Sequence, residues 1–534
     1  MQNSEPSNLE RARRLIDECA KSGIKEFCVC AGSRNSPFLS VLAGAEGFKI
    51  YSFSDERAAS FFALGRIKDS RRPVAVVCTS GTAVAELLPA TIEAFYQKQP
   101  LVLISADRPQ GYRGTGAPQS IDQTRILEDY CELVWDVGIE QTPPNLSQYN
   151  FKKPLHINVC FEEPLIDEEM LNWAPEFSSY ETSTSLKSSP KDLQKFIYSD
   201  SILVLLGAIS LQEKEAVKRF LLQLKAPIWA EAISNLREDP DLQPLLIKSG
   251  ERFLSKVTWK RVLRLGGVPS CRFWRDLETM SGVEVMSVSR EGFSGLSRES
   301  KHFDASLETA LDVSKVTPAP VTDKVFHLDQ LFRQQLKLLM GELPLSEVSL
   351  LSHLSQRISD LSSVFLGNSL VIREWNLGAR FNVGQREYHA NRGANGIEGQ
   401  LSTFFGVSQE KKNLCWGIFG DHTTLYDLNA PWALRFLKRQ PRGIVLINNG
   451  GGQVFSRVND LTPLWANPSA RSMLECRHEI NFEPWAKMWD LDYVRVESSE
   501  RFRIPQDSFV MELRPDPEQS SQFWRSYQKL WESL

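Results

Sequence analysis

The sequence lacks the features that mark membrane and secreted proteins. No run of about 18 apolar residues occurs, so no transmembrane helix is expected. The segment 1–23 is polar and charged, without the apolar core of a signal peptide. The nine cysteines are scattered and form no C-x-x-C pair, which is typical of reduced thiols rather than a disulfide framework. We therefore expect a cytoplasmic protein.

An excess of one charge is also missing. The chain has 62 Lys and Arg against 66 Asp and Glu, for a formal net charge of −4. This balance gives no reason to expect nucleic acid or a membrane surface as a partner. No G-x-G-x-x-G follows the first apolar run and no G-x-x-x-x-G-K-[S/T] is present. A standard dinucleotide site and a P-loop are therefore not expected.

What the sequence does contain is a regular alternation of short apolar runs, small polar turns and helical periods over 534 residues. This alternation predicts α/β domains with mainly parallel sheets flanked by helices. We expect three domains, over 1–180, 190–320 and 345–534, with a Ser/Thr-rich linker at Ala174–Pro190. Strands are predicted at Lys25–Ser33, Pro73–Ala83, Pro100–Pro109, Pro154–Cys160, Ser201–Ser210, Ala226–Ser234, Lys260–Gly267, Val283–Arg290, Ser362–Ser369, Asn413–Asp421, Arg442–Gly452, Tyr493–Ser498 and Ser508–Arg514.

Oxygen-bearing side chains follow two of these strands. Asp421 comes directly after an apolar run, and the next strong run leads into Asn448-Asn449 and a glycine loop. A carboxylate, carboxamides and backbone carbonyls suit a hard cation such as Mg²⁺ that also binds phosphate oxygens. The set contains no His or Cys ligand, so zinc is not expected. Either motif alone favours a turn closed by an Asp or Asn side chain, but the two together favour a metal–diphosphate site.

Glu56 and the turn Thr79–Thr82 are ambiguous when read locally. Glu56 opens an Ala-rich helical segment, where a surface Glu-Arg pair is the simpler interpretation. Beside a cofactor ring in an apolar pocket it would instead favour its protonated form and share a proton with a ring nitrogen. The turn Thr79–Thr82 passes into an amphipathic helix, either as an ordinary connection or as a seat for an anion or a polar cofactor edge.

Four arginines stand beside turns that follow predicted strands or in a glycine-rich segment: Arg34, Arg108, Arg373 and Arg392. A single arginine in such a place is usually a surface ion pair. Because the guanidinium group binds carboxylates through two parallel hydrogen bonds, the four together favour polyanionic substrates.

Asp421 and Asn449, with the spacing between them, resemble the diphosphate–Mg²⁺ motif of thiamine diphosphate enzymes. Nine segments occur in order: AGSRNSP, SDER, TSGTAVAEL, SADRP, GAPQSIDQ, GNSLVIR, NRGANGIEGQLST, GDHTTLYDLNA and NNGGGQVFS. Together they resemble the 2-succinyl-5-enolpyruvyl-6-hydroxy-3-cyclohexene-1-carboxylate synthase family of menaquinone biosynthesis. The likeness is strong in the first and third regions and weak in the middle one.

The resemblance implies pyrimidine-binding, central and diphosphate-binding α/β domains. It implies a transferase that decarboxylates 2-oxoglutarate and adds the resulting carbanion to isochorismate. It also implies a homodimer or homotetramer whose active sites lie between the first domain of one subunit and the third domain of another. The cofactors would be thiamine diphosphate and Mg²⁺, with Mn²⁺ as an alternative ion.

The resemblance also assigns residues to these roles. Glu56 is the catalytic residue, in contact with the aminopyrimidine ring. The metal ligands are Asp421, Asn449 and the carbonyl of Gly451, with Asn448 the weaker candidate. The cofactor contacts are Glu56, Ser80, Gly81, Thr82, Ile397 as an apolar wedge, Asp421, Asn449 and Val454. The substrate contacts are Ser33, Arg34, Arg108, Gln119, Arg272, Ser369, Arg373, Arg392 and Phe455.

Some positions depart from the family pattern: Ala58 replaces a glycine, Pro118 an amide residue and His422 an apolar residue, and a Lys-Arg pair is Arg272-Phe273. These changes concern substrate affinity more than the cofactor site. Two alternatives stay open, namely another thiamine diphosphate-dependent 2-oxoacid decarboxylase or carboligase, and a non-catalytic protein of the same fold.

Overall fold

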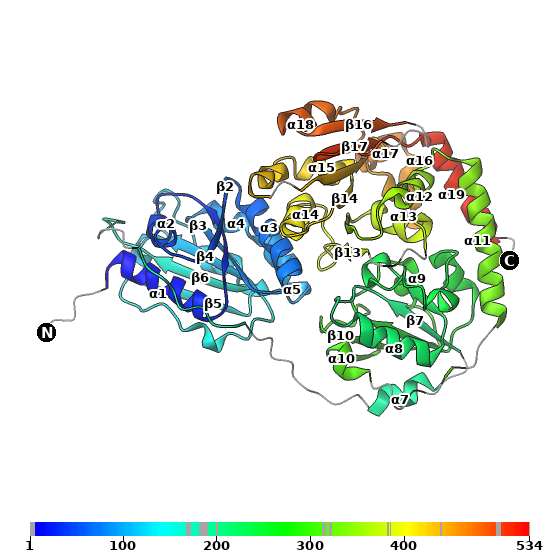
Figure 1. Cartoon of the computed structure of the whole chain (residues 1–534), viewed down its shortest axis with the longest axis horizontal. Helices are drawn as coiled ribbons and strands as arrows, with labels where there is room; N and C mark the ends of the chain where they lie inside the picture. The colour runs from blue at the N-terminus through cyan, green and yellow to red at the C-terminus, as the bar shows by residue number, and fades with distance from the viewer. Residues whose placement is uncertain are drawn as a thin grey trace. The chain divides into compact units, whose positions relative to one another are not determined.

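The computed structural model contains three parallel β-sheets, each flanked by helices (Figure 1). This confirms the predicted fold class. The structure describes residues 6–166, 172–180, 191–198, 201–311, 316, 318–319, 323–381, 384, 386–437, 440–497 and 503–532. The chain divides into two compact units, which we describe separately. The first comprises Met1–Ser183, Gly393–Lys411 and Tyr426–Arg439, and the second comprises Thr184–Arg392, Lys412–Leu425 and Gln440–Leu534.

The first unit contains a six-stranded sheet of order β2-β1-β3-β4-β6-β5. Its strands are β1 (Glu26–Cys30), β2 (Lys49–Phe53), β3 (Val74–Cys78), β4 (Leu101–Asp107), β5 (Leu133–Val137) and β6 (Leu155–Cys160). Its helices are α1 (Asn8–Lys21), α2 (Ser36–Ala43), α3 (Glu56–Ser70), α4 (Thr82–Glu86), α5 (Leu88–Tyr96), α6 (Gln123–Ile126), α14 (Gln400–Ser408) and the 3₁₀ segments η1 (Gln110–Tyr112), η2 (Glu128–Tyr130), η3 (Leu146–Gln148) and η8 (Ala430–Phe436). The helix predicted after the turn begins at Thr82 as expected, but it is divided into α4 and α5, because Pro89 lacks the N–H group that would continue it.

The second unit contains two sheets, of order β11-β10-β9-β7-β8 and β13-β12-β14-β15-β17-β16. The first has β7 (Ile202–Leu206), β8 (Ile228–Ala230), β9 (Arg261–Leu265), β10 (Glu284–Ser289) and β11 (Lys301–Asp304). The second has β12 (Ser363–Leu366), β13 (Glu387–His389), β14 (Cys415–Gly420), β15 (Arg442–Ile447), β16 (Asp492–Val496) and β17 (Phe509–Leu513).

The helices around these two sheets come from several parts of the chain. They are α7 (Lys191–Ile197), α8 (Lys214–Leu224), α9 (Arg272–Asp276), α10 (Leu307–Ala310), α11 (Asp323–Glu342), α12 (Glu347–Arg357), α13 (Leu370–Gly378), α15 (Asp421–Tyr426), α16 (Thr462–Ala466), α17 (Pro468–Glu475), α18 (Glu483–Met488), α19 (Pro517–Glu532) and the 3₁₀ segments η4 (Ala232–Ser234), η5 (Gln243–Leu245), η6 (Glu251–Lys256), η9 (Gln453–Arg457) and η10 (Asn459–Leu461).

The two six-stranded sheets have the same connection pattern. Counted from the first strand of each sheet, both run in the order 2-1-3-4-6-5. All their strand pairs are parallel, including β1 with β2 and β12 with β13. The sequence of these two regions shows only a shared alternation of strands and helices. The structure therefore adds that the first and third sheets repeat one topology.

The predicted strands are all present, but four strands were missed: β2, β5, β11 and β13. Each of the four lies at the edge of its sheet. An edge strand buries little surface and has no need of a continuous apolar run, so its sequence signal is weak. The predicted domain boundaries stay predictions, and residues 181–190 of the predicted linker lie outside the described residues.

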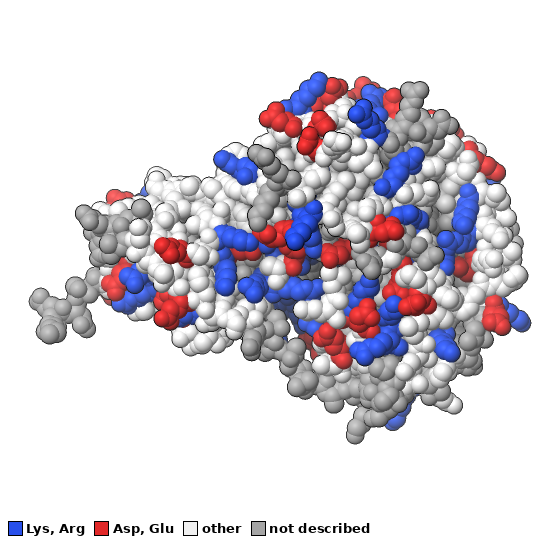
Figure 2. All heavy atoms as spheres, in the orientation of Figure 1, with Lys and Arg blue, Asp and Glu red and all other residues white. Residues whose placement is uncertain are grey.

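Acidic and basic side chains are intermixed over the face of the molecule in Figure 2, in keeping with the net charge of −4. Among the described residues, no helix is both long enough and apolar enough to cross a bilayer.

Candidate active site

The carboxyl edge of the first sheet gathers most of the predicted site residues of the first unit. The strands β2, β1, β3 and β4 are consecutive and parallel. The segments that follow them carry Glu56, Ser33 with Arg34, Ser80–Thr82 and Arg108 respectively. In open α/β sheets, ligands bind at this edge.

Glu56 is the first residue of α3, whose N-cap is Asp55. The Asp55 carboxylate accepts a hydrogen bond from the N–H of Ala58 at 2.8 Å, which fixes the start of the helix. Glu56 is half-buried, and burial raises its pKa, with smaller contributions from Asp55 and Glu86. A carboxyl group with a raised pKa keeps its proton to a higher pH than a free carboxyl group does.

The segment after β4 folds back on itself between Arg108 and Gln119. Nε of Arg108 donates to the carbonyl of Pro118 at 3.1 Å, and its guanidinium group lies 5.7 Å from the ring centroid of Tyr112. A Cβ on Gly81 would lie 3.1 Å from Cα of Gln119, so the two predicted contact segments touch. Pro118, the departure from the family's amide residue, thus supplies a carbonyl that holds Arg108.

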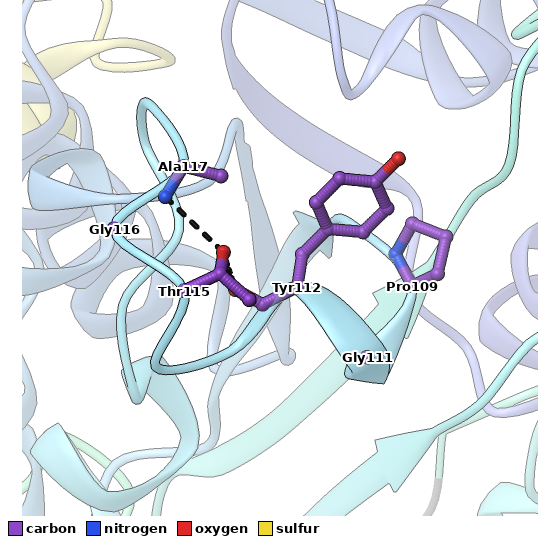
Figure 3. Close-up of a pocket in the computed structure, with 6 residues that line it drawn as sticks. All are labelled: Pro109, Gly111, Tyr112, Thr115, Gly116 and Ala117. Atoms are coloured by element: carbon purple, nitrogen blue, oxygen red, sulfur yellow. Dashed lines mark hydrogen bonds between the residues drawn. The ribbon is translucent and has the colours of Figure 1, made fainter.

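A pocket of about 560 Å³ opens within this segment (Figure 3). The hydroxyl of Thr115 donates to the carbonyl of Tyr112 at 2.7 Å and accepts from the N–H of Ala117 at 3.3 Å. These bonds hold the turn that shapes the pocket. It is lined by Pro109, Gly111, Tyr112, Thr115, Gly116 and Ala117.

A buried polar network behind these segments was missed by the sequence analysis. Oε1 of Gln123 accepts from the N–H of Gly81 at 2.9 Å, and its Nε2 donates to Asn158 at 2.7 Å. Asn158 donates to Asp107 at 3.2 Å, and Asp107 accepts from the N–H of Arg108 at 2.8 Å. The network therefore joins the glycine turn to the Arg108 segment. The polar residue that interrupts the apolar run of β6 was the available signal.

Arg34 and Ser33 lie after β1, but in different surroundings. Arg34 is buried, with Nη1 donating to the carbonyl of Phe161 at 3.2 Å and Nη2 to Glu163 at 3.1 Å. Ser33 is exposed. The guanidinium group of Arg34 is thus already engaged within the first unit.

The segment that carries Ile397 is anchored by Glu93, a second residue that the sequence analysis missed. The Glu93 carboxylate accepts from the N–H groups of Gly393 at 2.8 Å and Ala394 at 2.7 Å. Glu93 is buried, and Ile397 is half-buried. A Glu on the buried face of a helix was the signal that could have identified Glu93.

The third sheet repeats this arrangement in the second unit. The strands β13, β12, β14 and β15 are consecutive and parallel. The segments after them carry Arg392, Ser369 with Arg373, Asp421 and Asn449. The predicted metal ligands therefore follow neighbouring strands at the same edge.

The donor atoms of Asp421 and Asn449 fit a hard cation. Asp421 is buried, and its Oδ2 accepts from the N–H of Gly451 at 3.0 Å. The Asn449 amide donates Nδ2 to Glu347, while its Oδ1 is buried without a hydrogen-bond partner. Asn448 turns inward and donates to Glu512 at 2.8 Å. A buried carboxylate and an unpaired buried amide oxygen, at the ends of neighbouring strands, match the ligand chemistry of Mg²⁺.

Two histidines lie beside Asp421, although the motifs themselves include no His ligand. Ligand atoms of Asp421, His422 and His478 all lie within 4.8 Å of one another. Nε2 of His478 is 3.2 Å from Oδ2 of Asp421, and its Nδ1 accepts from the N–H of Ile480 at 3.3 Å. With Nδ1 used as an acceptor, the ring proton belongs on Nε2, which faces the carboxylate without making a hydrogen bond. His478 comes from a distant segment without any motif spacing, which is why it was missed.

Two predicted substrate arginines lie close together in the second unit. Nη1 of Arg392 donates to Oδ1 of Asn368 at 3.0 Å. Arg373 is half-buried, and burial followed by the neighbouring charge of Arg392 lowers its pKa. Glu251 and Glu231 oppose this shift, so the two arginines have acidic as well as basic neighbours.

The remaining predicted residues of the second unit differ in accessibility. Phe455 is exposed and Val454 half-buried, both within η9. Arg272 is exposed and pairs with Asp276 at 2.8 Å. Phe273 is buried in the core of the unit.

Known proteins resemble this chain over nearly its whole length. Residues 10–126 match the family described as thiamine pyrophosphate enzyme, N-terminal TPP binding domain. A 2-succinyl-5-enolpyruvyl-6-hydroxy-3-cyclohexene-1-carboxylate synthase of Bdellovibrio bacteriovorus is 40% identical, with 98% of this chain and 99% of the relative covered. A protein of the same name from Akkermansia muciniphila is 37% identical, with 96% and 97% covered. The chain therefore belongs to the 2-succinyl-5-enolpyruvyl-6-hydroxy-3-cyclohexene-1-carboxylate synthase family of thiamine diphosphate enzymes.

Proposed function

We propose that this protein is a transferase that decarboxylates 2-oxoglutarate and joins the remaining four-carbon unit to isochorismate. The products are CO₂ and 2-succinyl-5-enolpyruvyl-6-hydroxy-3-cyclohexene-1-carboxylate, a step of menaquinone biosynthesis. The observation that carries the proposal is the carboxyl edge of the third sheet. It combines the oxygen donors Asp421 and Asn449 with the closely spaced cations Arg373 and Arg392.

We assign the cofactor site to residues of both units. When bound, thiamine diphosphate supplies the electron sink for decarboxylation. Asp421, Asn449 and the carbonyl of Gly451 would hold Mg²⁺ against the diphosphate. The Gly451 carbonyl accepts one bond, from the N–H of Gln453 at 2.9 Å, and keeps a second lone pair. Further cofactor contacts are assigned to Ser80, Gly81, Thr82, Ile397 and Val454.

Glu56 would hold a proton next to the aminopyrimidine ring of the cofactor. Its raised pKa supports this role, because a carboxyl group that titrates closer to neutrality can both give and take the proton. The cause is burial first, which disfavours the charged carboxylate.

The charge of the proposed substrates accounts for the arginines at the proposed binding positions. Both 2-oxoglutarate and isochorismate carry two carboxylates, and arginine binds carboxylates through paired hydrogen bonds. Arg373 and Arg392 follow the neighbouring strands β12 and β13, which supports a place where a dicarboxylate is bound. The other substrate contacts that we propose are Ser33, Arg34, Arg108, Gln119, Arg272, Ser369 and Phe455.

We further propose a cytoplasmic homodimer or homotetramer with active sites between subunits. A second candidate function, another 2-oxoacid decarboxylase or carboligase of the same cofactor, would use the same metal and Glu56 sites. The paired arginines favour the 2-oxoglutarate reaction over one that uses a monocarboxylic 2-oxoacid.

The deciding experiment follows isochorismate absorbance with purified protein, thiamine diphosphate, Mg²⁺ and 2-oxoglutarate, omitting each in turn. We expect loss of isochorismate only when all four are present. If isochorismate is not consumed while CO₂ is still released from a 2-oxoacid, the result would favour the second candidate function. If calorimetry detects no Mg²⁺-dependent binding of thiamine diphosphate, the result would favour a non-catalytic protein of this fold.

A further inference from the structure

A carboxyl group outside the predicted site holds the amide of Asn449. Nδ2 of Asn449 lies 3.2 Å from Oε1 and 3.2 Å from Oε2 of Glu347. Glu347 is the first residue of α12, and only 3% of its surface is exposed. Its own N–H donates to the hydroxyl of Ser520 at 3.2 Å. Backbone and side chain of Glu347 are therefore both fixed.

This contact determines which end of the Asn449 amide faces away from Glu347. A side-chain amide has two orientations of almost the same shape, and only one presents oxygen to a metal. The carboxyl oxygens of Glu347 accept hydrogen bonds from Nδ2, so Oδ1 must lie on the opposite side. That Oδ1 is buried and has no hydrogen-bond partner. A buried oxygen without a partner destabilises the fold unless a ligand satisfies it.

Glu347 is itself supported from behind. Nη1 of Arg457 donates to Oε1 of Glu374 at 2.5 Å, and its Nη2 lies 3.8 Å from Oε2 of Glu347. The Arg457 guanidinium group also lies 4.1 Å from the ring centroid of Trp524. These contacts keep the Glu347 carboxyl group in one place rather than letting it follow the amide.

We propose that Glu347 is a positioning residue for metal loading, which orients Asn449 so that Oδ1 faces the ion of the thiamine diphosphate site. The proposal rests on the proposed function, since that function makes Asn449 a metal ligand. A residue that orients a metal ligand typically changes metal affinity about 10- to 100-fold when it is removed. The effect should fall on metal affinity and not on turnover at saturating metal.

The test uses Mn²⁺ as the probe, because free Mn²⁺ is counted directly by electron paramagnetic resonance in the presence of thiamine diphosphate. We expect Glu347→Leu, which removes both acceptors, to bind Mn²⁺ about 10- to 100-fold more weakly. The Mn²⁺ concentration for half-maximal activity should rise by the same factor while kcat at saturation stays close to wild type. Glu347→Gln keeps one acceptor oxygen and should stay within about threefold of wild type.

The matched control is Ser346→Ala. Ser346 is the N-cap of α12 and accepts from the N–H of Ser349 at 3.3 Å, so its loss weakens the same helix end without touching Asn449. We expect a lower Tm and unchanged Mn²⁺ affinity. If Glu347→Leu does not fold, Glu347→Ala takes its place.

The outcomes separate two kinds of failure. Wild-type Mn²⁺ affinity in the Leu or Ala variant would overturn the positioning role. An equal loss of Mn²⁺ affinity in Ser346→Ala would overturn it as well, because the effect would then be one of helix stability. No binding of Mn²⁺ with thiamine diphosphate by the wild-type protein would instead overturn the proposed function.

Discussion

Among the carboxyl groups of the first unit whose pKa is raised by burial, Glu56 and Asp427 differ in their surroundings. Glu56 is half-buried at the sheet edge where a ligand would bind. Asp427 is fully buried, and accepts from the N–H and the hydroxyl of Ser402 at 2.8 and 3.0 Å. One group is accessible for proton transfer, while the other belongs to the interior of the fold.

Glu56→Gln should keep the fold and Mg²⁺-dependent cofactor binding but lose turnover. Glutamine has nearly the same size and keeps one acceptor oxygen, but it cannot exchange a proton in the way that a carboxyl group does. We expect a reduction of about 10²- to 10⁴-fold in the rate of isochorismate loss. Calorimetry with thiamine diphosphate supplies the control for binding. Full activity of this variant would refute the role of Glu56.

Asp427 should make the stability of the protein depend on pH. Burial raises its pKa to about 6, whereas an unfolded Asp titrates near about 4. Between these values the folded state holds the proton more tightly, so this group's contribution to the free energy of unfolding falls as pH rises and levels off above about 6. Asp427→Asn should remove that slope. Denaturant midpoints of the wild type and the Asp427→Asn variant, measured from pH 4 to pH 7, test this prediction. A difference between the two midpoints that does not change with pH would contradict it.

Among individual residues, motifs identified the groups that we propose to contact a ligand, but not the groups that hold them in place. Glu56, Asp421 and Asn449 stand in short, recognisable segments. Glu93 and Glu347 do not, since each is defined by partners far away in the sequence. Such partners become visible only when the backbone is in place.

At the element scale, the crossing of α3 and α14 in the first unit is closely packed. A Cβ on Gly65 would lie 2.1 Å from the carbonyl oxygen of Thr403, and one on Gly406 would lie 2.2 Å from that of Phe62. These close atoms belong to the backbone, which cannot move aside in the way that the end of a flexible side chain can. Both glycines are therefore required by the distance between the two helices.

Gly406→Ala should destabilise the protein, whereas the same change in an open helix should not. We expect Gly406→Ala to cost about 1–3 kcal/mol or more, because the added methyl group meets backbone. Gly341, near the end of α11, has nothing within 4 Å of its missing Cβ, so Gly341→Ala should stabilise by about 0.5–1 kcal/mol. Thermal unfolding of both variants measures the contrast. Similar Tm values for the two variants would mean that α3 and α14 can move apart to accept the added methyl group, and would contradict the prediction.

The burial of each strand determined whether its sequence could predict it. The central strands β3 and β4 are buried along their whole length and appear as continuous apolar runs. The edge strands β2 and β11 alternate or are largely accessible, and their residues resemble loop residues. The hydrophobic pattern therefore identified the interior strands of each sheet and missed four edge strands.

At the scale of the whole molecule, the predicted catalytic and metal-binding groups belong to different compact units. Glu56 follows a strand of the first sheet, and Asp421 and Asn449 follow strands of the third. The two sheets share one topology, and each offers the same edge to a ligand. The sequence could not reveal this repeat because topology survives changes that remove sequence likeness.

Subunit mixing tests the proposed placement of active sites between subunits. Glu56→Gln and Asn449→Ala oligomers should each be inactive. Co-expression of the two chains should restore about a quarter of wild-type activity, because random pairing in a symmetric dimer leaves that share of sites free of both changes. Light scattering gives the oligomeric state of each preparation. Absence of restored activity in a mixed oligomer would place each site within one subunit.

The discontinuity of the first unit bears on how the protein is made. The helix α14 emerges from the ribosome roughly 330 residues after α3, which takes about 20 to 60 s at bacterial translation rates. During that delay the surface around Gly65 that meets α14 has no partner, while the central sheet is being synthesised. The nascent chain thus carries an exposed apolar face that chaperones can bind. The unit that is begun first cannot be completed until segments from late in the chain arrive.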